Sequence, residues 1–287
     1  MVKSSTIKDV AEKAKVSIST VSRYLNDTAK INPLLRMRVE QAIRELDFVP
    51  NAAARSLKNQ QTRVIGILVS DIANAFFINI CKTLEGMLAQ YGYSLMICSS
   101  YENRDYEARS LKVLFERRVD AIVVCPGGKN NDLLLSMHRS GMPVVVLDRI
   151  FDDLPLDTVA ENTREASKKL TQSLLGMGHR KIACLMGSEQ SKTAIQREEG
   201  IREAYAEAGL EMDERLIYRN CTDEWKAHLA TQSLLEDAAA PTALFATNPR
   251  ITNGALLYLV EKQIALPEQL SFACFTQKNT MYPYPAQ

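Results

Sequence analysis

The sequence predicts a small all-α unit at the N-terminus, followed by a larger α/β unit built on two parallel sheets. Two observations lead to this fold class. Apolar residues first recur at helical spacings, and from Arg63 onward apolar strand-like runs alternate with helical stretches. Glycine is absent from residues 1–65, and all twelve glycines follow. A chain of 287 residues is long enough for such a pair of units.

The all-α unit begins with two short helices joined by a tight turn. Thr6 is a good N-cap for a helix over 7–14, whose apolar residues recur at spacings of three and four. The stretch AKV interrupts this pattern, and Ser17 then caps a second helix over 18–25. A third helix over 33–46 closes the core. We therefore predict a helix-turn-helix unit, which places its second helix in the major groove of DNA.

The outer surface of the second helix has an unusual composition. A generic surface helix exposes Glu and Lys, whereas this helix exposes small hydroxyl side chains and one guanidinium. Such groups suit base edges and phosphates. The residues that form this surface are Ile18, Ser19, Thr20, Ser22 and Arg23.

A short Ala-rich stretch links the two units. We predict a helix over 51–58 with an exposed Leu57, and then a polar linker that ends at Thr62. A helix of this length is marginal by itself in water. It therefore needs outside contacts in order to form.

The α/β unit contains two runs of alternating elements, which predict two subdomains with a cleft between them. The strands are nearly all apolar, as is typical of parallel sheets covered on both faces. In the first run we expect strands at 63–69, 93–98, 120–125 and 143–147, and helices at 76–91, 103–118 and 131–140. In the second run we expect strands at 181–186, 242–246 and 269–275, and helices near 163–178, 192–208, 224–239 and 250–263.

Charge is distributed unevenly along the chain. Residues 1–63 hold twelve Lys and Arg against six Asp and Glu, whereas the remainder holds 23 against 28. A basic N-terminal segment on a mildly acidic body is the distribution expected of a DNA-binding unit attached to another domain.

Several functional classes find no support in the sequence. The first ten residues lack the apolar core of a signal peptide, and no run approaches 18 apolar residues, so we expect a cytoplasmic protein with no membrane contact. The six cysteines and three histidines are scattered, which favours reduced thiols over disulfides or a metal site. Neither a P-loop nor GxGxxG is present, and no nucleophile lies beside a base. We therefore expect no enzyme activity and no cofactor.

The stretch TIKDVAEKAKVSISTVSRYLN resembles the headpiece of LacI-family (LacI/GalR) bacterial transcription regulators. The match continues through FVPNAAARSLK and, more loosely, through most of the chain. The resemblance implies a lambda-repressor-like headpiece and a two-lobed domain like the periplasmic sugar-binding proteins. It divides the chain into a headpiece at 1–50, a hinge helix with linker at 51–62, and an effector-binding and dimerisation domain at 63–287.

By this resemblance, Ile18, Ser19 and Arg23 meet base edges. A bidentate Arg23–guanine contact discriminates between bases by about 1–3 kcal/mol. Ordinary capping and surface polarity are the alternative for some of the remaining hydroxyls. Lys15 departs from the family, which has Gly in the turn; a left-handed Lys15 costs about 1 kcal/mol. The implied phosphate contacts are Thr6, Ser17, Thr20, Ser22 and Asn26.

The segment NAAARSLK resembles the family's hinge helix. Its Leu57 is then an apolar wedge between the central base pairs, flanked by Ala54 and Arg55. Such a wedge unstacks a flexible step at a cost of a few kcal/mol, which new contacts offset. A plain linker is the alternative.

The segment that follows the first strand implies effector contacts. DIANAFF at 71–77 follows the first strand and resembles the family's NPFF segment, with Ala75 in place of Pro. The carboxyl edge of a parallel sheet is where α/β ligand sites form. Phe76 can stack on an apolar ligand face, while Asp71 and Asn74 bond hydroxyl groups.

Three further segments complete the expected effector site. Asp148 and Arg149 follow a later strand, although a salt-bridged surface pair is the alternative. Arg197 matches the family's effector-binding arginine, with plain helix surface as the alternative. Asn248 lies in ATNPRITNGAL, which resembles the family's ATND…GAL segment, with Pro249 where Asp is usual.

The C-terminal residues depart from the family pattern. Family members continue for some fifty residues after SFACF, beginning with an Asp that contacts the effector, whereas TQKNTMYPYPAQ follows here and Thr276 takes the Asp position. The sequence looks C-terminally truncated, and a frameshift near residue 276 and a natural short form are both open. If it is a truncation, we expect an incomplete effector domain with reduced stability, impaired dimerisation and a weakened effector response.

These observations together predict a homodimeric, sequence-specific transcriptional repressor. Its expected partners are a near-palindromic double-stranded DNA operator and a small-molecule effector, a sugar or sugar acid, with a nucleobase left open. Two alternatives remain: a truncated, dimerisation-defective regulator with residual DNA binding, and a sugar-binding protein without a regulatory role.

Overall fold

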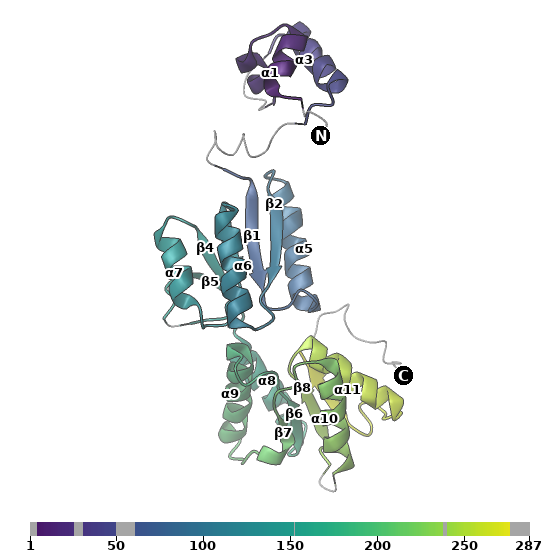
Figure 1. Cartoon of the computed structure of the whole chain (residues 1–287). Helices are drawn as coiled ribbons and strands as arrows, with labels where there is room; N and C mark the ends of the chain where they lie inside the picture. The colour runs from purple at the N-terminus through teal and green to yellow at the C-terminus, as the bar shows by residue number, and fades with distance from the viewer. Residues whose placement is uncertain (1–4, 26–30, 50–60, 152, 238–239, 276–287) are drawn as a thin grey trace. The chain divides into compact units, whose positions relative to one another are not determined.

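The computed structural model describes residues 5–25, 31–49, 61–151, 153–237 and 240–275. The chain divides into two compact units, Met1–Thr62 and Arg63–Gln287, which are treated separately below (Figure 1). The expected hinge helix at 51–58 and the residues from Thr276 onward lie outside the described residues. Within the described ranges, no helix is both long enough and apolar enough to cross a membrane.

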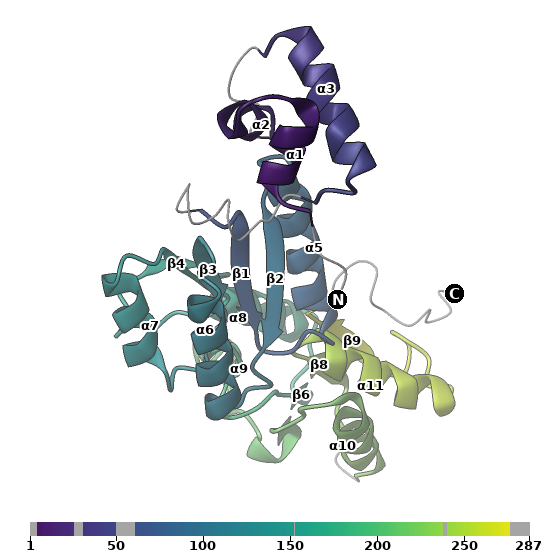
Figure 2. The same ribbon diagram turned by 45° about the horizontal axis from the view of Figure 1, so that its top comes forward.

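The N-terminal unit is a three-helix bundle of α1 (Ile7–Ala14), α2 (Ile18–Leu25) and α3 (Pro33–Glu45) (Figure 2). Thr6 caps α1 as predicted: its hydroxyl accepts from the Asp9 amide, and the Asp9 carboxylate accepts from the Thr6 amide, which completes a capping box. The small core of this unit comprises Val10, Ala11, Ala14, Val21, Val39, Ala42 and Phe48.

The turn between α1 and α2 is left-handed at Lys15, which has φ 51° and ψ 50°. Its amide donates to the Glu12 carbonyl at 3.0 Å, so the strained residue also closes the end of α1. The structure thus shows the conformation that favours glycine at this position, occupied here by a lysine.

The first lobe of the larger unit contains a five-stranded parallel sheet in the order β2-β1-β3-β4-β5. Helix α5 packs on one face, and α6 and α7 pack on the other (Figure 1). The strands are β1 (Val64–Val69), β2 (Ser94–Ser99), β3 (Ala121–Val124), β4 (Val144–Leu147) and β5 (Asp157–Val159), and the helices are α5 (Ala75–Ala89), α6 (Arg104–Glu116) and α7 (Asn131–Arg139).

The second lobe contains a four-stranded parallel sheet in the order β7-β6-β8-β9. Helices α8 and α9 cover one face, and α10 and α11 cover the other. The strands are β6 (Ile182–Leu185), β7 (Ile217–Tyr218), β8 (Ala243–Ala246) and β9 (Ser271–Cys274); the helices are α8 (Thr163–Gly176), α9 (Lys192–Glu207), the 3-10 turn η1 (Glu214–Leu216), α10 (Glu224–Glu236) and α11 (Pro249–Glu261).

Two strands, β5 and β7, were not predicted from the sequence. β5 has three residues, all exposed, and only one of them is apolar. β7 is only two residues long. Both are edge strands, so each needs only one neighbour. Pairing with β4 and β6 creates them, because neither segment has a hydrophobic pattern long enough to signal a strand.

Close helix packing in the second lobe depends on two glycines. A Cβ atom at Gly200 in α9 would lie 2.1 Å from the Arg164 carbonyl oxygen of α8. A Cβ atom at Gly254 in α11 would lie 2.1 Å from the Glu224 carbonyl oxygen of α10. Both contacts are with backbone atoms, so a larger residue must separate the two helices.

Gly200→Ala is therefore expected to lower the free energy of unfolding by about 1–3 kcal/mol or more, because the methyl group overpacks the α8–α9 contact. Gly86→Ala in α5 is the matched control, since no atom lies within 4 Å of its Cβ position. That exposed helical substitution should instead stabilise by up to about 1 kcal/mol. Urea unfolding of both variants measures the difference, and equal midpoints would contradict the packing argument.

Candidate functional site

The candidate nucleic-acid-binding surface lies on α2 and its N-terminal turn. Ile18 is 46% exposed although it is apolar, and Arg23 is exposed as well. No hydrogen bond or ion pair to Arg23 is found within the described ranges, so its guanidinium is available to an external partner. Of the other predicted contacts to DNA, Asn26, Ala54, Arg55 and Leu57 lie outside the described residues.

Three of the predicted phosphate contacts, Thr6, Ser17 and Thr20, also make local hydrogen bonds. The Thr6 hydroxyl donates to Asp9 Oδ2 at 2.7 Å, within the capping box. Ser17 Oγ accepts from the Thr20 amide at 3.2 Å and lies 2.7 Å from Ser19 Oγ and 2.9 Å from Thr20 Oγ1. These exposed hydroxyls form one connected group at the start of α2.

The candidate ligand site is a cavity of about 490 Å³ lined by both lobes. It lies at the carboxyl ends of the strands: β1 and β2 end in register at Val69 and Ser99, and their following residues reach the cavity. All seven residues predicted as effector contacts line it. They are Asp71, Asn74, Phe76, Asp148, Arg149, Arg197 and Asn248.

Further residues of the cavity were not predicted. Tyr101 is the second residue after β2, as Asp71 is after β1, and Glu102 is the next residue, so the same rule applied to β2 identifies them. Arg250 and Phe275 carry no comparable sequence signal. The remaining unpredicted polar lining residues are Ser70, Glu161, Ser188, Ser191, Thr193, Thr222 and Thr247.

Arg149 is held inside the first lobe. Its side chain is 5% exposed, and its guanidinium donates through both Nη atoms to the carboxylate of Glu102 and through Nη1 to the Pro126 carbonyl at 3.1 Å. The nearby Asp148 carboxylate lies 3.9 Å from Nε. The two Nη atoms of Arg149 thus donate to protein partners. Arg149 also orients the Glu102 carboxylate, which is about half exposed in the cavity.

Asp148 has an unusual backbone and environment. Its φ of 69° places it in the left-handed region directly after β4. Burial raises the pKa of its carboxyl, and the charges of Arg149 and Arg197 oppose that increase. The Cys125 thiol lies 3.7 Å from Oδ2. Strain of this kind is found where a structure holds a side chain for binding.

Arg197 contributes a guanidinium from α9 in the second lobe. It donates to Thr163 Oγ1 at 2.7 Å and to the Thr247 carbonyl at 2.6 Å, and it lies 4.9 Å above the ring of Phe275. Burial lowers its pKa, while Asp148 and Glu161 counteract this electrostatically. The carbonyl and hydroxyl partners fix its orientation without neutralising its charge.

The two asparagines of the cavity cap helices. Asn74 Oδ1 accepts from the Phe76 amide at 3.0 Å and begins α5, and Asn248 Oδ1 accepts from the Ile251 amide at 3.0 Å and begins α11. Both asparagines line the cavity, and each side chain also carries an NH₂ group that can donate hydrogen bonds. Phe76 packs edge-on against Phe77, with ring centroids 5.0 Å apart, so an aromatic surface lies beside these donors.

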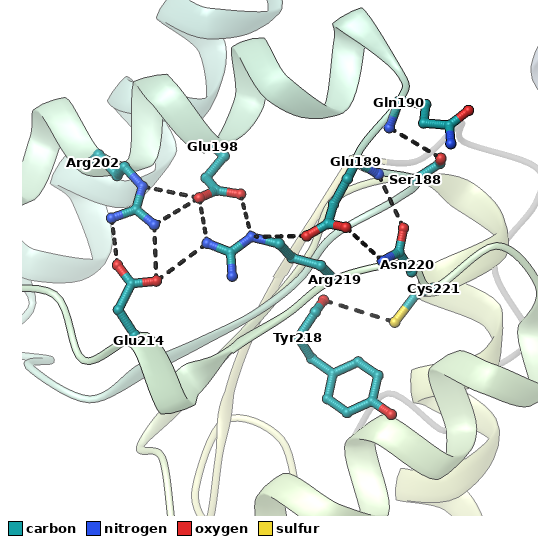
Figure 3. A network of polar contacts seen from close by, with 10 residues as sticks. All are labelled: Ser188, Glu189, Gln190, Glu198, Arg202, Glu214, Tyr218, Arg219, Asn220 and Cys221. Carbon is teal, nitrogen blue, oxygen red and sulfur yellow. Dashed lines mark hydrogen bonds and ion pairs between the residues drawn. The ribbon is translucent and has the colours of Figure 1, made fainter.

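A network of ion pairs in the second lobe connects Glu198 and Arg202 of α9 with Glu214 and Arg219 (Figure 3). Glu198, the residue after Arg197 on α9, accepts from Arg219 at 2.6 Å and from Arg202 at 2.7 Å. Glu214 accepts from both arginines as well. The network therefore ties α9 to the segment after β7, from which Cys221 and Thr222 reach the cavity.

Two hydrogen bonds between Asn220 and Glu189 connect the segment after β7 to the loop after β6. Asn220, in the left-handed region at φ 62°, accepts from the Glu189 amide at 3.1 Å and donates to the Glu189 carboxylate at 2.9 Å. Two loops that line the cavity are thereby held to each other (Figure 3). The cavity is thus a preformed polar site of the size that suits a small ligand.

The described residues contain no cluster of three or more His, Cys, Asp or Glu placed to hold a metal ion. Burial raises the pKa of the Cys125 and Cys184 thiols, which keeps them protonated. The side chains that line the cavity supply hydrogen-bond donors and acceptors, aromatic faces and charges.

Comparisons with known proteins agree with this architecture. Residues 62–273 match the family described as periplasmic binding proteins and sugar binding domain of LacI family, and residues 6–51 match bacterial regulatory proteins, lacI family. The chain is 34% identical over 271 residues to the HTH-type transcriptional repressor PurR of Vibrio atlanticus, covering 93% of the chain and 80% of that relative.

Solved structures show the same fold. The Lac repressor dimer bound to operator and the anti-inducer ONPF superposes with a TM-score of 0.82 at 23% identity, over 94% of the chain and 82% of that protein. The transcriptional regulator CelR in complex with cellobiose superposes with a TM-score of 0.64 at 25% identity, over 93% and 81%.

The Glu214 carboxylate yields a pH prediction. Hydrogen bonds from Arg202, with a further one from Arg219, lower its pKa from 4.5 to about 2. A lowered folded-state pKa stabilises the protein above pH 4.5, and this contribution is lost as the pH falls toward 2. Glu214→Gln should be less stable than the unmodified protein at pH 7, and the gap should narrow below pH 4.5. Urea unfolding between pH 7 and pH 2 measures this difference in the free energy of unfolding, and Glu116→Gln is the control. A difference that stays constant with pH would contradict the lowered pKa of Glu214.

Proposed function

Because this chain belongs to the LacI family of bacterial transcriptional regulators, we propose that it is a sequence-specific repressor controlled by a small molecule bound between its two lobes. The observation that carries the proposal is that α2 has Ile18, Ser19 and Arg23 exposed, while the other unit has a preformed cavity lined by charged, polar and aromatic side chains. DNA reading and ligand binding are thus assigned to separate units of one chain.

The N-terminal unit reads DNA through α2 in the major groove. Arg23 is suited to a bidentate contact with guanine, while Ile18 and Ser19 contact neighbouring base edges. The hydroxyl group at the start of α2 positions the helix on phosphates. An eight-residue helix covers few base pairs, so specific binding requires two copies on a near-palindromic operator, which makes the working form a homodimer.

The cavity takes a small polar effector. Carboxylates of the first lobe accept hydrogen bonds from ligand hydroxyls, and the Asn74 amide of the same lobe donates. Arg197 and the Asn248 amide donate from the second lobe. Phe76 supplies an apolar surface for the face of a sugar ring or a nucleobase. A sugar or sugar acid fits this mixture of groups. The similar regulator CelR was solved in complex with cellobiose, which is a sugar.

Ligand binding controls DNA binding by a shift between lobe arrangements. The ligand contacts both lobes, so it favours the arrangement in which both sets of contacts form. The first strand, β1, begins directly after the linker to the DNA-binding unit. A change in the lobes therefore acts on the segment that includes Ala54, Arg55 and Leu57, proposed as the minor-groove wedge and its flanks.

Arg23→Ala is expected to weaken binding to the specific operator by about 1–3 kcal/mol more than binding to unrelated DNA. Arg44→Ala removes one positive charge from α3 of the same unit and serves as the matched control. Footprinting on DNA upstream of the gene, with titrations at fixed salt, separates the two effects. Equal losses in both variants would show that Arg23 reads no base.

A thermal-shift screen tests the effector site with monosaccharides, sugar acids and nucleobases as probes. The probe that binds should stabilise the full chain, by about 2.7 kcal/mol at a hundredfold excess over its Kd. Arg197→Gln should abolish the probe-dependent increment, because it removes the guanidinium from the cavity, whereas Arg215→Gln on the surface of the same lobe should retain it. An increment that survives Arg197→Gln would place the ligand elsewhere.

A further inference from the structure

Arg250 occupies a position that its own helix does not favour. It is the second residue of α11, after the N-cap Asn248 and Pro249, and the first turn of that helix contains no acidic residue. Helix N-termini carry partial positive charge, so a cation there is unfavourable and an anion is preferred. The reason for an arginine at this place must therefore lie outside α11.

The partner of Arg250 comes from the other lobe. Its Nη1 atom donates to Oδ2 of Asp71 at 2.8 Å, across 179 residues of sequence. The two side chains are 38% and 26% exposed, and both line the ligand cavity. The second oxygen of Asp71 accepts from the Ala73 amide at 2.9 Å. This carboxylate is therefore fixed at the end of β1 when it meets the guanidinium.

We propose that Arg250 is a positioning residue of the cavity, which holds the Asp71 carboxylate in place and sets the separation of the two lobes when no ligand is bound. The assignment of Asp71 as a ligand contact rests on the proposed function, whereas the link between the lobes does not. Two weaker contacts join the lobes as well: Lys129 Nζ donates to Gln190 Oε1 at 3.4 Å, and Lys192 Nζ lies 6.0 Å from the Phe151 ring centroid.

The position of Asp71 connects this pair to the linker through strand β1. Asp71 lies just beyond the carboxyl end of β1, and Val64 begins the same strand about 20 Å away, next to the linker. A ligand hydroxyl or amine that binds Asp71, or a ligand carboxylate that binds Arg250, competes with the Arg250–Asp71 ion pair. Ligand entry thus loosens one link between the lobes while forming new ones.

Hydrogen–deuterium exchange on the full chain, without ligand or DNA, tests this proposal. Arg250→Gln should speed exchange in the segment 70–77 of the opposite lobe by about two- to fivefold, the range expected for a partly exposed ion pair. Arg250→Lys keeps the charge and should restore most of the protection. Arg215→Gln, which removes a surface pair within the second lobe, should leave segment 70–77 unchanged.

Arg250→Asp separates the link between lobes from a local role in α11. An acidic residue at this position favours the helix N-terminus, so exchange in α11 should stay equal or slow, while repulsion from Asp71 speeds exchange in 70–77. Added salt should speed exchange in 70–77 of the unmodified protein, because at about 1 M the Debye length falls to about 3 Å, and should have little effect on Arg250→Gln.

Any of three results would overturn the proposal. One is unchanged exchange in 70–77 in both Arg250→Gln and Arg250→Asp, and another is a change confined to α11. A failure of the charged Arg250→Lys variant to restore protection has the same consequence. Since neither DNA nor effector is present, these outcomes are independent of whether the chain represses transcription.

Discussion

Parallel pairing of the strands in both lobes is the constraint on which the binding cavity depends. Each strand of a parallel sheet is followed by a crossover, so the carboxyl ends of all strands in one sheet meet at the same edge. Loops after β1, β2 and β4 therefore converge in the first lobe, and loops after β6 and β8 converge in the second. The cavity collects side chains from Ser70 to Phe275 for this topological reason.

The charges brought to that edge are held by specific partners. Arg149 is bound by Glu102, Arg250 by Asp71, and Arg197 by a hydroxyl and a backbone carbonyl. Partial burial makes an unpartnered charge costly, so these contacts are needed for the cavity to exist without a ligand. They also orient the groups before a ligand arrives, which reduces the ordering that binding requires.

The N-terminal unit depends on local interactions to a greater degree. Its capping box at Thr6, its left-handed turn at Lys15 and its small core all involve residues close in sequence or on adjacent short helices. Because the core is small, the outer face of α2 does not pack against it. A unit of this kind presents a fixed helix, whereas the larger unit presents a cavity whose two walls belong to different lobes.

Arg197 and Asn248 were expected as cavity residues from the family resemblance. The sequence by itself determined the described helices and most strands, the division near residue 62, the cap at Thr6 and the five cavity residues that follow a predicted strand. Those signals are local: apolar spacing, capping residues and position after a strand extend over a few neighbours. The tertiary structure alone decided that β5 and β7 are strands, that Arg149 is occupied by Glu102, and that Arg250 meets Asp71. These features depend on which distant segments the fold brings together, and no property of the individual segments encodes that choice.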